Sequence, residues 1–178
     1  MNDAIDWWAV AGGWAIDLWL GAESRPHHDV EVVVRRCDQR KVHRALVTTS
    51  TMWCLDPPGS GWRPWSGEPI EPPSFQLQAR SPWGEFDLFA ETVDRTTWTF
   101  RRDERITRPI EHVITQSTTG IPIVRPEIQL LYMAASTEPK NQHDFETARP
   151  YLEPDDTRWL RDSLAIAHPE HRWLDSLR

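Results

Sequence analysis

The pattern of apolar and polar positions in the first part of the chain predicts a buried strand followed by a buried helix. Residues 7–11 are apolar and run into the pair Gly12-Gly13, which is typical of a short strand that ends in a glycine turn. Residues 14–20 are apolar on every side of a helix except at one acidic position. Gly21 is well suited to end that helix, because glycine adopts the left-handed conformation at little cost.

Apolar runs and alternating positions also predict strands farther along the chain. These strands are expected at residues 30–34, 75–79, 85–89, 98–101 and 121–124. In residues 85–89 the alternation places Phe86 and Leu88 toward the core and Asp87 on the opposite side.

Two segments between these strands differ in character. Asp38 is a candidate N-cap for a helix over residues 39–47, whose apolar positions share one face. Residues 56–73 hold much of the proline and several glycines, so a long irregular loop is expected there.

The last third of the chain reads as helical. Pro126 suits a first helical position, and Glu127 in the first turn is expected to cap a helix that runs to about residue 136. Further helices are expected over residues 140–149, from about residue 154, and within residues 170–177. The chain therefore combines strands and one or two helices with a helical C-terminal part.

Composition narrows the class of protein. A length of 178 residues suits one domain, or one domain with a small helical appendix. The net charge of −7 argues against nucleic acid as the main partner, because such proteins usually carry a basic face. Cys37 and Cys54 lack metal or redox spacing and are expected to be reduced thiols. No apolar run is long enough for a membrane span and Met1-Asn2-Asp3 is not a basic leader, so a cytoplasmic protein is expected.

The candidate chemistry lies in Asp29 and Glu31, two positions apart on an expected strand. Their side chains point to the same side of a sheet and repel each other unless a cation lies between them. Magnesium is the usual cation for such oxygen ligands. The pair Gly12-Gly13 lets the backbone approach phosphate oxygens, and the N-terminus of the following helix favours anions. Together these features describe a metal–triphosphate site.

At these residues the sequence resembles a known family, the aminoglycoside-2''-adenylyltransferase and lincosamide nucleotidyltransferase-like members of the polymerase-beta-like superfamily. The resemblance is carried by the blocks at residues 11–21 (AGGWAIDLWLG), 25–32 (RPHHDVEV), 98–103 (WTFRRD) and 120–132 (GIPIVRPEIQLLY), and by Lys140 with Asp144-Phe145. It implies an α+β fold with a twisted mixed β-sheet, flanking helices and a C-terminal helical segment. It divides the chain into a catalytic core, residues 1–124, and a helical segment packed on it, residues 125–178.

The resemblance also implies site residues. Asp29 and Glu31 are expected to hold two magnesium ions, and Gly12 and Gly13 to cradle the triphosphate of ATP or another NTP. Asp87 matches the third carboxylate of the family, as a metal ligand or as the general base that takes the proton of the acceptor hydroxyl.

Several charged residues admit both a functional and a structural interpretation. Arg25 and His27 either contact the phosphates, or pair with a carboxylate and cap a turn, respectively. Asp17 lies in an apolar helix, so it is expected to hydrogen-bond locally and support the glycine turn. The pairs Arg101-Arg102 and Lys140/Asp144 are expected to lie at the surface, with a role in binding substrate as the alternative. For Glu127 the alternative to capping its helix is a position facing the acceptor cleft.

The sequence departs from the family at several positions. Glu31 stands where many relatives have aspartate, and only six residues precede Trp7, where the family usually has a helix. Met133 and Asn141 replace a lysine and an aspartate that are frequent in the family. If those groups serve the nucleotide or the acceptor, a different substrate or weak activity is expected.

The leading functional hypothesis is a magnesium-dependent enzyme that moves a nucleoside monophosphate, AMP in the simplest case, onto a hydroxyl of a small molecule such as an aminoglycoside-like antibiotic. An acidic cleft would suit such a cationic acceptor. The alternatives are a toxin-type or regulatory nucleotidyltransferase that modifies protein or tRNA, and a silent nucleotide-binding module. The expected oligomeric state is a monomer or a homodimer.

Overall fold

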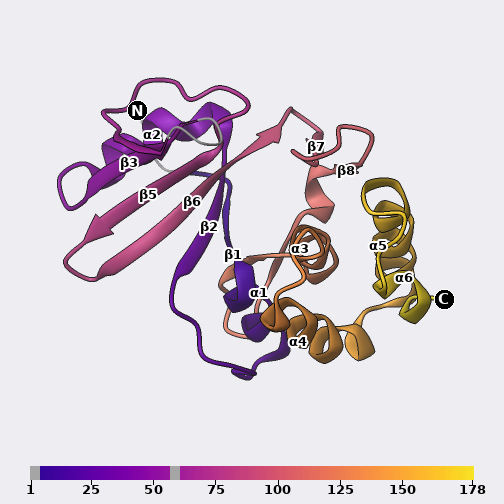
Figure 1. The fold of residues 1–178 in the computed structure, drawn as a ribbon. Helices are drawn as coiled ribbons and strands as arrows, with labels where there is room; N and C mark the ends of the chain where they lie inside the picture. Colours follow the sequence, from indigo (N-terminus) through magenta and orange to yellow (C-terminus); the bar gives the residue numbers. More distant parts are fainter. Residues whose placement is uncertain (1–4, 57–60) are drawn as a thin grey trace.

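The computed structural model describes residues 5–56 and 61–178 (Figure 1). The N-terminal residues 1–3 and part of the expected loop 56–73 therefore lie outside the described residues. No helix among the described residues is long and apolar enough to cross a membrane. Cys37 and Cys54 are free thiols, as expected from their spacing.

Ten strands in the described part of the chain form a mixed sheet. The strands are β1 (Trp8–Ala11), β2 (Val30–Arg35), β3 (Thr51–Leu55), β4 (Trp62–Pro64), β5 (Gln76–Ser81), β6 (Gly84–Val93), β7 (Thr97–Thr99), β8 (Thr107–Pro109), β9 (Ile114–Gln116) and β10 (Pro122–Val124). Their order is β4-β3-β5-β6-β2-β1-β10-β9, and β7 and β8 extend from β6. β2 and β6 are parallel, as are β1 and β10, and the other pairs are antiparallel.

Six α-helices accompany this sheet among the described residues. They are α1 (Gly12–Leu20), α2 (Gln39–Leu46), α3 (Pro126–Met133), α4 (Pro139–Ala148), α5 (Pro154–Ala167) and α6 (Trp173–Ser176). Figure 1 shows α2 beside the β3–β6 end of the sheet, and α3 to α6 gathered on the opposite side of the molecule. The α+β fold class expected from the sequence is confirmed.

Two hydrophobic clusters use alternate residues of the same strands. Val34 and Leu88 pack with α2, whereas Val33 and Ala9 pack with the C-terminal helices. Side chains alternate between the two faces of a strand, so one sheet serves two cores. The expectation that Phe86 and Leu88 share a core face is confirmed.

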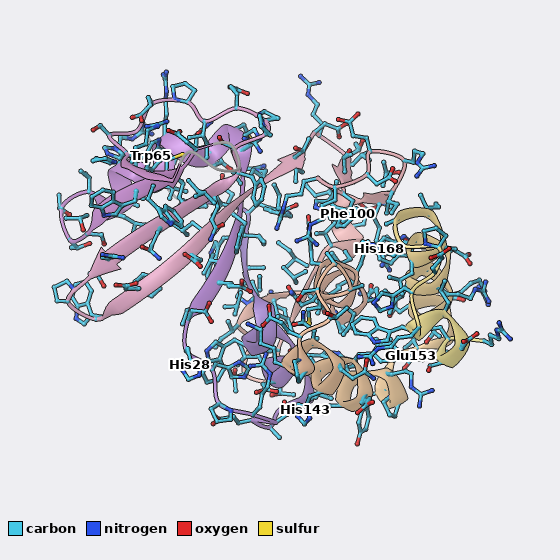
Figure 2. The ribbon with its side chains drawn as sticks, viewed as in Figure 1. His28, Trp65, Phe100, His143, Glu153 and His168 are labelled. Atoms are coloured by element: carbon cyan, nitrogen blue, oxygen red, sulfur yellow. The ribbon has the colours of Figure 1, made fainter. Side chains whose placement is uncertain are left out.

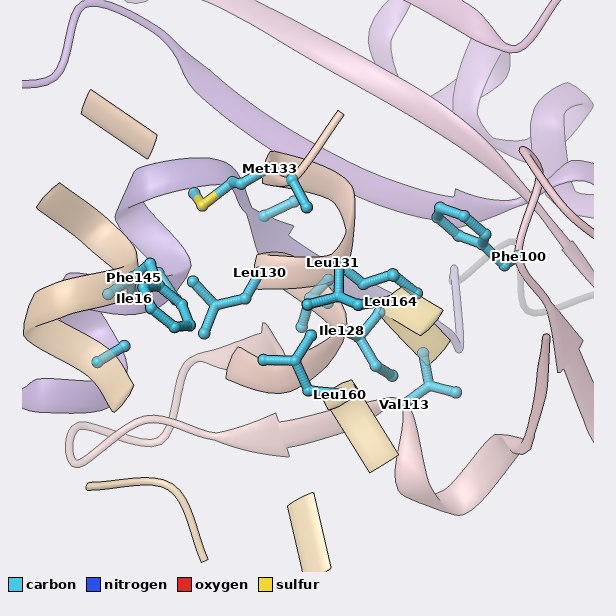
Figure 3. Packing of buried hydrophobic residues seen from close by; sticks show 14 of the residues in the cluster. Ile16, Phe100, Val113, Ile128, Leu130, Leu131, Met133, Phe145, Leu160 and Leu164 are labelled. Atoms are coloured by element: carbon cyan, nitrogen blue, oxygen red, sulfur yellow. The ribbon is translucent and has the colours of Figure 1, made fainter. Parts of the chain in front are cut away.

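Helix α3 lies at the centre of the larger cluster. Of its side chains, Ile128, Leu130 and Leu131 are almost completely buried, and they lie among residues of α1, α4 and α5 in Figure 3. Seven of the eight residues of α3 are buried, and α1, α4 and α5 are the helices that enclose it.

The sequence analysis missed part of the sheet. β3 was not expected, although its side chains alternate between exposed and buried positions, and neither were the three-residue strands β8 and β9. The expected loop 56–73 contains β4, which pairs with β3. Strands of three residues carry too few positions for a period of two to stand out.

Asp38 does not cap α2 through its side chain, contrary to expectation. Its carboxylate instead pairs with Arg35 Nε at 2.6 Å and with Lys41 Nζ at 3.0 Å. The two cations compete successfully for the oxygens that would have reached the backbone N–H groups.

Glu127 makes no capping hydrogen bond either, and it does not face the cleft described below. Its fully buried carboxylate pairs with Arg108 at 2.6 Å and with Arg125 at 2.8 Å. Both arginines also pair with Asp156 of α5 at 2.9 and 2.8 Å. This four-residue cluster ties α3 and α5 to β8, so the role of Glu127 is to join elements.

Shortening a side chain in this core is expected to cost stability. Leu130→Ala should lower the free energy of unfolding by about 2–5 kcal/mol, because it removes buried methyl groups and leaves a cavity. Val47→Ala, at a half-exposed position, should change it by less than about 0.5 kcal/mol. Urea unfolding followed by circular dichroism measures both. Equal losses in the two variants would contradict the assignment of the core.

Candidate active site

A cleft of about 500 Å³ opens between the sheet and the α3–α4 region. Its walls come from the β1–α1 turn, the loop before β2, strands β2 and β6, and the segment that follows β7. The residues that line it are Ala11, Gly12, Gly13, Arg25, His27, His28, Asp29, Glu31, Val33, Phe75, Gln76, Phe89, Arg101, Arg102, Val124, Gln129, Tyr132, Met133, Ser136, Glu138, Lys140 and Asn141. Figure 2 shows His28 in the loop that leads into β2.

The start of α1 forms one end of this cleft. Gly12 has φ of +66°, and a Cβ placed on it would collide with Oε2 of Glu31. Glycine is required here twice, once by the left-handed backbone and once by the space that Glu31 occupies. The carboxylate of Glu31 therefore lies directly against the first residue of a helix, where anions are favoured.

The three candidate carboxylates come from two neighbouring strands. Glu31 and Asp87 are register partners in the parallel pair β2–β6, and Asp29 directly precedes β2. Asp29 and Glu31 line the cleft, whereas Asp87 lies beside it, half-buried, and accepts a hydrogen bond from Gln78 at 3.4 Å.

These carboxylates perturb one another. Burial raises the pKa of Glu31 to about 7, with further contributions from the charges of Asp29 and Asp87. Burial also raises the pKa of Asp87, as does the charge of Asp29, while the hydrogen bond from Gln78 acts in the opposite direction. Negative charge at the site is therefore only partly compensated by the protein.

The donor set fits a hard divalent cation in its chemistry. It offers carboxylate oxygens, and the raised pKa of Glu31 reflects negative charge that a cation would neutralise. Within residues 5–56 and 61–178, however, no three His, Cys, Asp or Glu side chains are already gathered closely enough to hold a metal ion.

Arg25 and His27 lie over Gly13, and a Cβ on that glycine would collide with both. Arg25 Nε and Nη2 donate to the two carboxylate oxygens of Asp144, each at 2.7 Å. Arg25 Nη1 donates to His27 Nδ1 at 3.1 Å, so the other ring nitrogen of His27 donates to Asp17 at 2.6 Å. A chain of polar contacts thus runs from α1 to α4 above the glycine pair.

These polar contacts test several expectations from the sequence. Asp17 hydrogen-bonds locally, as expected, since it also accepts from Ser24 at 2.6 Å. Asp144 does not form an exposed pair with Lys140 but is buried against Arg25, and Lys140 pairs with Glu138 at 3.2 Å. Arg25 pairs with a carboxylate, which was the structural interpretation, and yet it also lines the cleft.

Asn141 has a structural use that accounts for its departure from the family pattern. Its side-chain nitrogen donates to the carbonyl oxygens of Met133 at 3.0 Å and Ser136 at 3.4 Å, which closes the turn between α3 and α4. An ionised aspartate at this position has no proton to donate to these carbonyls.

Arg101 was expected at the surface, and the structure corrects this. Its side chain is only 12% exposed, lines the cleft and pairs with the buried Glu91. Phe75, Phe89 and Tyr132 surround its guanidinium. The alternation of Asp87, Phe89 and Glu91 on one face of β6 was the signal that could have linked Glu91 to the site.

Comparisons with known proteins agree with this picture. Residues 2–57, about a third of the chain, match the family model described as aminoglycoside-2''-adenylyltransferase. The fold is similar to that of the lincosamide antibiotic adenylyltransferase LnuA, solved with lincomycin bound, with a TM-score of 0.56 and 14% identity over 80% of this chain and 85% of that chain. It is also similar to the solution structure of the antibiotic-resistance factor ANT(2'')-Ia, with a TM-score of 0.52 and 13% identity over 91% and 83%. No match was found among curated protein sequences.

The resemblance expected from the sequence is therefore confirmed, at two levels. The family model matches the segment that carries Gly12, Gly13, Asp29 and Glu31. The solved structures extend the likeness to the fold of most of the chain.

The raised pKa of Glu31 predicts a pH-dependent stability. A carboxyl group with a pKa near 4.5 when unfolded and about 7 when folded stabilises the fold fully below pH 4.5, and this contribution is lost as the pH rises through 7. In metal-free protein at pH 8, Glu31→Gln should therefore be more stable than the wild type, by up to about 3 kcal/mol. At pH 5 the difference should be much smaller.

Urea unfolding in EDTA at the two pH values measures this difference. Glu85→Gln, at an exposed position of the same sheet, is the control and should show no such dependence. A stability difference between wild type and Glu31→Gln that does not change with pH would contradict the perturbed pKa.

Proposed function

We propose that this protein is a magnesium-dependent nucleotidyltransferase that moves a nucleoside monophosphate from an NTP, probed first as ATP, onto a hydroxyl group of a small antibiotic-like molecule. The observation that carries the proposal is the carboxylate of Glu31 held against the start of α1, next to Asp29 and in register with Asp87. Acidic oxygens beside a helix N-terminus supply the two requirements of such a reaction, a place for metal and a place for phosphate.

Different residues along the cleft serve metal binding and triphosphate binding. Asp29 and Glu31 would hold the metal, with Asp87 as a further ligand or as the general base. The triphosphate would be received at the start of α1, where backbone N–H groups favour anions and Arg25 and His27 lie over Gly13. Arg25 and His27 adjoin this position, and the guanidinium of Arg25 supplies positive charge at the same end.

The reaction is an in-line displacement at the α-phosphorus. The acceptor oxygen forms a bond to the α-phosphorus. At the same time the bond between the α-phosphorus and the oxygen that links it to the β-phosphorus breaks, and pyrophosphate leaves with the electron pair of that bond. The acceptor proton passes to Asp87 or to water. Magnesium, when bound, supplies Lewis-acid stabilisation of the attacking and leaving oxygens.

The class of acceptor is supported by the names of the similar proteins and by the charges in the cleft. LnuA is an adenylyltransferase of lincosamide antibiotics, and the matched family model is named for aminoglycosides. The cleft is not uniformly acidic, since Arg25, Arg101, Arg102 and Lys140 also line it. Arg102 donates to the carbonyl oxygen of Tyr132, and the other three are each paired with a carboxylate. Asp29 and Glu31 have no ion pair among the described residues. A cationic or neutral hydroxylated acceptor fits this balance.

Pyrophosphate release tests the proposal. The protein is incubated with magnesium, each NTP, and a panel of aminoglycosides and lincosamides. Release should depend on one acceptor class, and Asp29→Ala should lower the rate about 100-fold or more, because even residues that only support metal ligands typically cost 10- to 100-fold. Glu85→Gln, on the same strand as Asp87 but exposed, should retain the wild-type rate.

Asp87→Asn separates the two roles left open for Asp87. A loss of rate with unchanged magnesium affinity identifies a base, and a parallel loss of both identifies a metal ligand. ATP binding without release for any small acceptor would overturn the antibiotic-like acceptor and favour protein or tRNA. Absence of magnesium-dependent ATP binding would overturn the proposal as a whole.

A further inference from the structure

The guanidinium of Arg101 is fixed in the wall of the cleft on nearly all sides. Its central carbon lies 4.5 Å from the ring centre of Phe75, 5.0 Å from that of Phe89 and 4.2 Å from that of Tyr132. Nη1 pairs with Glu91, and Nε is buried without a hydrogen-bond partner. An arginine usually keeps its head in water, so this enclosure removes most of the freedom of the side chain.

Glu91 is held as firmly as the arginine that it binds. Its side chain is 2% exposed, and Oε2 accepts hydrogen bonds from Trp98 Nε1 at 2.8 Å and from the Tyr132 hydroxyl at 2.7 Å. Burying an ion pair costs desolvation that a well-packed apolar pair would avoid. Stability alone therefore gives little reason for the buried pair of Arg101 and Glu91. The position of the pair in the wall of the cleft suggests a functional reason.

The pair lies in line with the candidate carboxylates. Asp87, Phe89 and Glu91 occupy alternate positions of β6 and so face the same side of the sheet, with about 7 Å between successive members. The charge of Arg101 also acts on Glu31, whose pKa it lowers against the effect of burial. Arg101 is thus a cation beside the place where the proposed reaction occurs.

The other cations of the cleft are less suited to a fixed role near the carboxylates. The donors of Arg25 are already engaged by Asp144, Pro26 and His27. Lys140 is exposed and paired with Glu138 at the rim. Arg102 is also exposed, and its Nη1 donates to the carbonyl oxygen of Tyr132 at 2.7 Å. For Arg101, by contrast, the single hydrogen bond within the described residues uses Nη1, which leaves Nη2 for a ligand.

We propose that Arg101 donates a hydrogen bond to a non-bridging oxygen of the phosphoryl group that is transferred, with Glu91 as its positioning residue. This inference rests on the proposed function. Charge on that phosphoryl group is redistributed in the transition state, and a guanidinium that is already in place stabilises it without reorganisation. Such a contact is stronger than one between neutral groups, because both partners are charged.

Binding of separate parts of the donor tests this contact. ATP, adenosine and inorganic pyrophosphate are titrated calorimetrically in magnesium. Because Arg101→Gln alone would leave Glu91 buried without its cation, the main variant is the double substitution Arg101→Gln with Glu91→Gln. ATP should bind about tenfold more weakly or worse, since a charged hydrogen bond is lost. Adenosine and pyrophosphate, which both lack the α-phosphoryl group, should bind as to the wild type.

The matched control is Arg105→Gln, in the same segment between β7 and β8 but paired with Asp103 at an exposed position outside the cleft. It should leave all three affinities and the rate unchanged. Equal weakening of ATP and adenosine would place Arg101 at the base, and weakening of pyrophosphate would place it at the leaving group. Either result, or unchanged ATP binding in the double variant, would overturn the inference.

The positioning role of Glu91 has its own readout. Glu91→Gln keeps the charge of Arg101 but loosens its placement, so kcat should fall about tenfold while the KM of the acceptor stays the same. A KM effect without a change in kcat would overturn this role. If the wild type neither binds ATP nor releases pyrophosphate, the proposed function fails and this inference falls with it. If the wild type does both and the double variant matches it, only this inference fails.

Discussion

The close approach of Glu31 to Gly12 is the constraint on which the site depends. No side chain other than hydrogen fits at position 12, and the positive φ there excludes most other residues in any case. This approach fixes the end of β1 and the start of α1 against β2. Strands β1 and β2 are antiparallel neighbours, and Ala11 lies opposite Glu31. The rest of the sheet then places Asp87 beside Glu31 through the β2–β6 register. A carboxylate pair, a helix N-terminus and a glycine turn are thereby brought together by a few backbone contacts.

The two faces of the sheet are used for different purposes. One face packs on α2 through Val34 and Leu88 and forms the smaller core. The other carries Glu31 and Asp87 opposite each other on β2 and β6, with the apolar side chains of Val33 and Phe89 next along, where the larger core begins. Since residues alternate along a strand, the same short segments supply both a core and a charged cleft. Burying a carboxylate beside other acidic groups is unfavourable, and this is why the pKa of Glu31 is raised to about 7.

Sequence reasoning located the parts of the site whose signal is local. Gly12, Gly13, Asp29 and Glu31 lie within twenty residues, and their spacing alone pointed to one site; the structure brings Gly12 and Gly13 together with Asp29 and Glu31 in one cleft. Long elements such as β2, β6 and α5 carry enough positions for their period to be read, and they were found. The roles of Asp29, Glu31 and Asp87 as metal ligands, and the division at residue 124, stay predictions.

Long-range partnerships could not be read from the sequence in the same way. Asp144 looked like half of a helix-surface pair with Lys140, because residues four apart on a helix are neighbours. Its actual partner, Arg25, comes from the N-terminal part of the chain. The residues next to Arg25 and Asp144 in the sequence do not indicate that the two side chains pair. Arg101 looked exposed for the same reason, since the rings that enclose it come from three separate segments. Glu127 and Asp38 were assigned to capping, but nearby arginines and a lysine bind their carboxylates more strongly.

The pairing of Arg25 with Asp144 has a consequence for the order in which the protein folds. The two residues are 119 positions apart, so the polar chain above the glycine pair can form only when α4 has been synthesised and has docked on α1. Contacts of such separation form late, because the entropy of closing a long loop must be overcome first. A nascent chain that has completed β1, α1 and β2 thus already carries Asp29 and Glu31, yet it lacks the carboxylate that orients Arg25. Assembly of the end of the cleft at Gly12 and Gly13 is therefore among the last steps of folding.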